Sequence, residues 1–226
     1  MYENKDNIQN ISAPPGALWT VWLLWVLIYA AGYGAGALIG AMAAGQVLRL
    51  FPAAQQGLDN NWAVLASGLV WAATVGFVLS GFQSLLLHYH IPRFDWRRWV
   101  FASVLGLMGA VGLVAALQRL IADQANTFIY FTLYLSVLVA IAGGILGWAQ
   151  HLALRDYLPD ENRWIAANCI MAAVSTLLVM LWFAGRRGNG VYLDFDFFWL
   201  GGAIFLGIGL ATGFVLYSLL RHPQPE

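Results

Sequence analysis

Every charged residue of the sequence lies outside six long apolar stretches. Of 226 residues, 11 are basic, 11 are acidic and 61% are hydrophobic. A helix needs about 20 consecutive apolar residues to cross a bilayer, and each stretch is that long or nearly so. The stretches lack the alternation of apolar and polar residues that marks a membrane β-barrel. The sequence therefore predicts an all-α integral membrane bundle of about six transmembrane helices, at 18–44, 62–87, 99–117, 128–154, 164–184 and 197–220.

Two short polar tails flank this predicted membrane domain, which covers residues 18–220. The N-terminal tail, residues 1–17, ends near Pro14 and Pro15, and proline disfavours helix in the residue before it. The C-terminal tail covers residues 221–226. The first apolar stretch is about twice as long as the apolar region of a secretory signal peptide, so we expect it to remain as a membrane helix.

Lysine and arginine predict the orientation, because cytoplasmic flanks of membrane helices carry an excess of them. With six spans, both termini lie on one side, which holds Lys5, Arg93, Arg97, Arg98, Arg155, Arg163 and Arg221. The opposite side holds Arg49, Arg119, Arg186 and Arg187. Seven against four predicts cytoplasmic termini. Tryptophan is enriched at membrane–water interfaces, and seven tryptophans near span ends are expected there: Trp19, Trp22, Trp62, Trp96, Trp99, Trp164 and Trp199.

A repeated pattern connects the even-numbered spans. Leucine follows Gln83 and Gln150 by four residues in both cases. A tryptophan opens the next span, sixteen residues after Gln83 and fourteen after Gln150. Thr212 takes the glutamine position in the last span. The pattern predicts three tandem helical hairpins of the same orientation, at about 18–87, 99–154 and 164–220.

A span that ends in Gly-x-x-Gln-x-x-x-Leu and is followed by a tryptophan resembles a group of uncharacterised bacterial multi-pass membrane proteins, from cyanobacteria and Chloroflexi-like genomes. The copies here are Gln83, Leu87 and Trp99, with Ser80 in the glycine position, and Gln150, Leu154 and Trp164. The resemblance implies an integral membrane location and no particular activity. Together with the charge bias, it leads us to expect the bacterial inner (cytoplasmic) membrane.

Glycines recur at four-residue spacing within three of the spans. Small residues four apart let helix backbones approach closely in a membrane. We expect such rows to pack helices within the chain, with a seam between copies or a backbone-lined groove as the alternatives. The rows are Gly32, Gly36 and Gly40, then Gly143 and Gly147, then Gly209 and Gly213.

A polar layer is predicted near the cytoplasmic end of the bundle, formed by Gln83, Gln150, Thr212 and Asn168. An amide inside a membrane needs partners, and interhelical hydrogen bonds are worth about 0.6–2 kcal/mol there. We expect the two glutamine amides to bond with each other and latch neighbouring hairpins together. The alternative is that the layer lines a site for water or a polar ligand.

The remaining polar residues predict interfacial or solvated positions. We interpret His88, His90 and His151 as interfacial residues rather than ligands of a metal or pigment, because no histidine lies deep within a span. Asp194 and Asp196 are expected to cap the last helix or to lie in its first turn. The alternative, a cation site, requires several converging oxygen ligands.

Catalytic signatures are missing from the sequence, which has no Gly-x-Ser-x-Gly, His-Glu-x-x-His or P-loop motif. No charged residue lies within a span, although such residues are the usual functional groups of coupled transporters. One cysteine, Cys169, allows no internal disulfide.

We therefore expect a non-enzymatic scaffold, accessory subunit or lipid-associated module, without a cofactor or metal. The alternative is a passive conduit for an uncharged or lipid-like molecule. Expected partners are membrane lipids and another membrane protein or a second copy, but not nucleic acid, because the net charge is zero.

Overall fold

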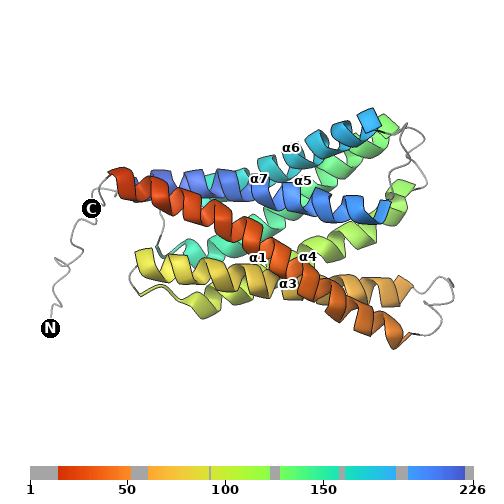
Figure 1. Ribbon diagram of the computed structural model, residues 1–226, viewed down its shortest axis with the longest axis horizontal. Coiled ribbons are helices and arrows are strands. Elements are labelled where there is room, and N and C mark those ends of the chain that lie inside the picture. Colours follow the sequence, from red (N-terminus) through yellow and green to blue (C-terminus); the bar gives the residue numbers. More distant parts are fainter. Residues whose placement is uncertain are drawn as a thin grey trace.

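The structure, a computed structural model, describes residues 15–51, 61–91, 93–122, 128–157, 161–186 and 193–221. Within these ranges the chain forms long helices and no strand (Figure 1). The helices are α1 (Pro15–Arg49), α3 (Asn61–His90), α4 (Trp96–Ala122), α5 (Phe128–Leu154), α6 (Glu161–Arg186) and α7 (Leu193–Arg221).

Each of these helices contains a segment that is long and apolar enough to cross a bilayer. The chain is therefore a multi-pass integral membrane protein with an all-α fold, as predicted. Most helices extend beyond the predicted spans, because charged residues occupy their end turns. Helix α1 begins at Pro15, within the predicted tail, and proline is tolerated in a first helical turn. Helix α7 begins at Leu193, so Asp194 and Asp196 fall in its first turn.

Several predicted features lie outside the described residues. They include nearly all of the N-terminal tail, the C-terminal residues 222–226, and Lys5 and Arg187 of the charge count.

The six helices form a closed ring in which each helix packs against two others. Helix α1 contacts α3 and α7, and the remaining contacts follow chain order, from α3 to α4, α5, α6 and α7. Figure 1 shows α1 lying obliquely across the bundle between α7 and α3. The start of α1 and the end of α7 lie at the same end of the bundle, which six crossings require.

The core near this end is built from residues that the predicted repeat equates. Leu87, Leu154 and Leu216 each stand four positions after one of the three equated polar residues, and each is 1% exposed. They come from α3, α5 and α7. Three alternate helices thus each contribute a fully buried leucine to the hydrophobic core.

The connection between α3 and α4 is fixed to the end of α5. Oδ1 of Asp95 accepts hydrogen bonds from the backbone N–H groups of Arg97 (3.1 Å) and Arg98 (3.2 Å), which makes Asp95 the N-cap of α4. The hydroxyl of Tyr157 donates to the carbonyl of Arg93 and accepts from the N–H of Asp95, each at 3.1 Å. These contacts bring the first turn of α4 beside the end of α5.

Candidate functional site

Three tryptophans fill the centre of the bundle near the end where α1 begins. Trp25 of α1 and Trp99 of α4 are 0% exposed, and Trp164 of α6 is 2% exposed. Their ring centroids are 6.4 Å apart for Trp25 and Trp99, 5.9 Å for Trp25 and Trp164, and 6.1 Å for Trp99 and Trp164. The indoles therefore form a nearly equilateral triangle on alternate helices.

Two of the predicted interfacial tryptophans belong to this triangle, so that prediction is wrong for Trp99 and Trp164. Trp19, Trp62 and Trp96 are exposed, as expected at an interface. For Trp164 the reason for the difference is a polar partner inside the bundle, because a buried indole N–H requires an acceptor and Gln150 on α5 supplies one. The ring of Trp99 is buried against the other two indoles, and its N–H has no such partner.

Two of the indoles donate hydrogen bonds to neighbouring helices. Nε1 of Trp25 donates to Oγ1 of Thr212 on α7 at 3.0 Å. Nε1 of Trp164 donates to Oε1 of Gln150 on α5 at 3.2 Å. In each case the acceptor is one of the polar residues that the predicted repeat equates. The bonds join α1 to α7 and α6 to α5.

Gln150 also contacts a third helix, because its Nε2 donates to Oγ of Ser103 on α4 at 3.3 Å. Its partners are therefore Trp164 and Ser103. The expected bond between the two glutamine amides is not formed, because both amide atoms of Gln83 are buried without a hydrogen-bond partner. Trp99 occupies the same place after Gln83 in the predicted repeat as Trp164 does after Gln150. Its Nε1 is also buried without a hydrogen-bond partner.

The four predicted layer residues are all buried: Gln83, Asn168 and Thr212 are 0% exposed and Gln150 is 1% exposed. The hydroxyl of Tyr29 faces the side chains of Thr212, Gln83 and Gln150. None of these groups has hydrogen-bonding geometry to that hydroxyl. Three of the four layer residues therefore meet around one phenol.

Asn168 is held within its own helix, because its Nδ2 donates to the carbonyl of Trp164 at 3.0 Å. Its Oδ1 is buried without a partner. Tyr29 and Ser103 also belong to the layer, although they were not among its predicted members. A signal was present, since Tyr29, Ser103 and Asn168 each stand four positions, about one helical turn, after a tryptophan of the triangle.

The first glycine row faces α3. A Cβ at Gly36 would lie 3.0 Å from the Cα of Val75. A Cβ at Gly32 would lie 3.1 Å from the Cα of Leu79, and one at Gly40 would lie 3.0 Å from Cδ1 of Trp71. Helix α1 therefore packs closely on α3 along this row.

The other two rows also face neighbouring helices of the same chain. A Cβ at Gly143 would lie 2.6 Å from the carbonyl oxygen of Asn168, and one at Gly147 would lie 2.9 Å from the Cβ of Asn168. A Cβ at Gly209 would lie 2.7 Å from Tyr29, and one at Gly213 would lie 2.9 Å from Trp25. The second and third rows therefore provide the space that the polar layer and the tryptophans occupy.

The structure describes three of the four histidines. His88 is exposed and His90 is half-buried at the end of α3. His151 follows Gln150 on α5, and its side chain is buried within the protein. Among the described residues, no three His, Cys, Asp or Glu side chains are grouped so as to hold a metal ion.

The chemistry available in the layer is hydrogen bonding between amides, hydroxyls and indoles. Such groups can hold helices together, or can bind water or a neutral polar molecule. Comparisons with protein-family models, with curated proteins and with solved structures found no match for this chain. The resemblance to bacterial multi-pass proteins remains a prediction from the repeated motif.

Proposed function

We propose that the chain is a non-enzymatic membrane module, acting as a scaffold, accessory subunit or lipid-associated protein, whose bundle is closed at the tryptophan triangle. The observation that carries the proposal is the burial of Trp25, Trp99 and Trp164 around the centre of the ring. Three large side chains in mutual contact leave no room there for a solute path. The hydrogen bonds to Thr212 and Gln150 make the triangle a latch between neighbouring helices.

A passive conduit for an uncharged or lipid-like molecule is the second candidate. The observation in its favour is a set of buried polar atoms without hydrogen-bond partners, on Tyr29, Gln83, Trp99 and Asn168. Unpaired buried groups of this kind are costly and often mark a site for water or a ligand. These atoms belong to the same layer as the indoles, so a solute that reached them would still meet the triangle.

We further propose the bacterial inner membrane as the location, with both termini cytoplasmic. The end of the bundle at which α1 begins carries Arg93, Arg97, Arg98, Arg155 and Arg163. Arg49, Arg119 and Arg186 lie at or near the opposite end, where α1, α4 and α6 stop. An excess of arginine on one side favours the cytoplasm for that side.

Vesicle permeability tests the closed bundle against the conduit. The purified chain is reconstituted into phospholipid vesicles, and the entry of water, glycerol and urea is followed by stopped-flow light scattering. We expect rates equal to those of vesicles without protein. Faster entry of any of the three, abolished by Gln83→Leu in protein that remains folded, would contradict the closed bundle and support the conduit.

A further inference from the structure

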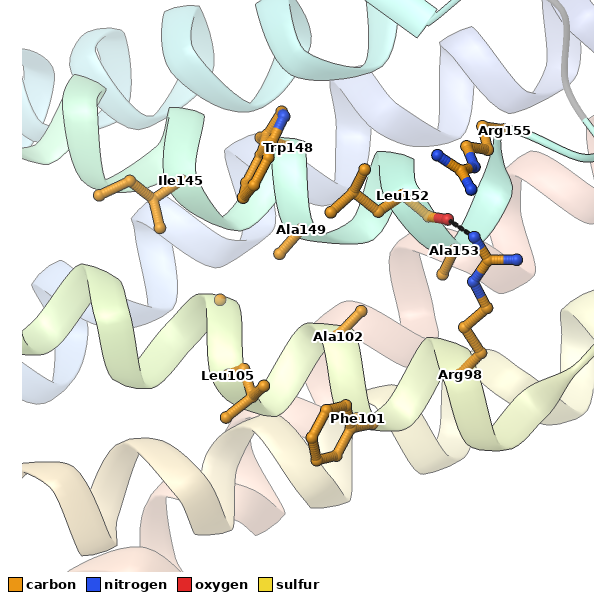
Figure 2. A pocket seen from close by; sticks show the side chains of 11 residues that line it. Arg98, Phe101, Ala102, Leu105, Ile145, Trp148, Ala149, Leu152, Ala153 and Arg155 are labelled. Atoms are coloured by element: carbon orange, nitrogen blue, oxygen red, sulfur yellow. Dashed lines mark hydrogen bonds between the residues drawn. The ribbon is translucent and has the colours of Figure 1, made fainter.

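An outward-facing groove runs between α4 and α5, with a volume of about 450 Å³. Figure 2 shows Phe101 and Leu105 on the α4 side and Ile145 and Trp148 on the α5 side. Phe101, Leu105 and Trp148 are 67%, 49% and 56% exposed. Because the chain spans a membrane, these side chains face the lipid.

The floor of the groove is built from small residues. A Cβ at Gly106 of α4 would lie only 2.8 Å from the Cβ of Ala149 on α5. The two helices therefore approach closely at the floor, while the large side chains on either side form raised walls. The result is an apolar channel along the helix pair, open to the hydrocarbon region on one side.

Two arginines lie at one end of this channel, as Figure 2 shows. Arg98 is in the first turn of α4, and Arg155 follows the last residue of α5. Both therefore stand where the apolar spans end, at the level of lipid headgroups. The arginines lie where a phospholipid has its headgroup, and the apolar channel lies where the lipid has its acyl chain.

The charge at this end is positive. Arg98 donates to the carboxylate of Asp156 and, through Nη2, to the carbonyl of Leu152. Nε of Arg155 lies 3.6 Å from Oδ1 of the same Asp156, beyond hydrogen-bonding distance. One carboxylate thus faces two guanidinium groups, which leaves one positive charge in excess. The carboxylate of Asp95, three residues before Arg98, is used as the N-cap of α4.

We propose that the groove between α4 and α5 binds one anionic phospholipid. The phosphate lies against Arg98 and Arg155, and an acyl chain lies between Phe101 and Trp148. Guanidinium groups match phosphate oxygens in geometry and charge, and basic pockets between membrane helices select anionic headgroups. The inference deepens the lipid-associated part of the proposed function and does not depend on the closure of the tryptophan triangle.

Native mass spectrometry tests the headgroup preference. The chain is titrated in detergent with phosphatidylglycerol and, separately, with phosphatidylcholine of the same acyl chains. We expect phosphatidylglycerol to bind about fivefold more tightly, which is the margin that one excess positive charge at the membrane surface supplies. The double variant Arg98→Gln/Arg155→Gln should lose this preference. The matched control is Arg97→Gln, on the same helical turn, whose guanidinium lies 5.6 Å from the centre of the Trp96 ring. The control should keep the preference.

Fluorescence quenching tests the acyl-chain position independently. Phosphatidylglycerol brominated on its acyl chains quenches the fluorescence of nearby indoles. The difference in quenching between the native protein and the Trp148→Phe variant measures the quenching of Trp148, and so reports on the groove. We expect this difference to be larger with brominated phosphatidylglycerol than with brominated phosphatidylcholine. If Arg98→Gln fails to fold, Arg155→Gln alone carries the test, because this side chain is 53% exposed.

Three results would overturn the proposal: equal binding of the two lipids by the native chain, an unchanged preference in the arginine variants, or a second copy of the chain that covers the groove and excludes lipid. Each would leave the vesicle permeability result unaffected. A failure of the lipid site is therefore distinguishable from a failure of the closed bundle.

Discussion

The indole nitrogen of Trp164 donates a hydrogen bond to Oε1 of Gln150 at 3.2 Å, and this bond joins α6 to α5 inside the membrane. The same glutamine donates to Ser103 of α4. One amide therefore links three consecutive helices across the boundary between the second and third predicted hairpins. The stability of the bundle should depend on this amide more than on any other layer residue.

Replacing Gln150 by leucine should destabilise the protein by about 1–3 kcal/mol, because it leaves the indole N–H of Trp164 and the hydroxyl of Ser103 buried without that partner. The measurement is thermal unfolding in a mild detergent. An unchanged melting temperature would show that the amide is dispensable for stability.

The substitution Gln83→Leu should behave differently, although the repeat equates the two residues. Its amide atoms have no hydrogen-bond partner, so leucine removes a buried polar group without breaking a bond, and stability should stay the same or rise by up to about 1 kcal/mol. The same unfolding assay compares both variants. A loss as large as that of Gln150→Leu would mean that Gln83 has partners in the membrane, such as water.

These two glutamines also show what the sequence could and could not predict. The spans follow directly from hydropathy, and the burial of Gln83, Gln150, Thr212 and Asn168 follows from their depth in the spans. The burial of Trp164 could not be deduced in this way, because a tryptophan near a span end is typical of an interface. Its environment depends on which neighbouring helix presents an acceptor, and that is a property of the packed ring.

The close contact of α1 with α3 predicts opposite effects for two nearby glycines. Gly36→Ala should destabilise the protein by about 1–3 kcal/mol, because the new Cβ meets the backbone of Val75 and overpacking has no easy relief. Gly34→Ala is the matched control, since a Cβ there has open space. Alanine favours helix over glycine by up to about 1 kcal/mol in water, so this control should be neutral or stabilising. Equal melting temperatures would show that α1 and α3 do not touch along this row.

The proposed orientation predicts the accessibility of two exposed arginines at opposite ends of the bundle. In a Cys169→Ser background, Arg49→Cys should react with an impermeant maleimide applied outside intact cells. Arg97→Cys should react only after the membrane is opened. The reverse pattern would place the termini outside.

A double-mutant cycle on Trp164 and Gln150 tests the latch most directly. Trp164→Phe removes the indole N–H while keeping an aromatic ring, and Gln150→Leu removes its acceptor. Each single variant should lose unfolding free energy. If the hydrogen bond stabilises the bundle, the sum of these two losses should exceed the loss in the double variant. The excess, which is the coupling energy, should be about 0.5–1.5 kcal/mol. The control cycle pairs Gln150→Leu with Trp62→Phe, whose ring is 77% exposed on α3, and should show no coupling. Additive losses for Trp164 and Gln150 would contradict the latch.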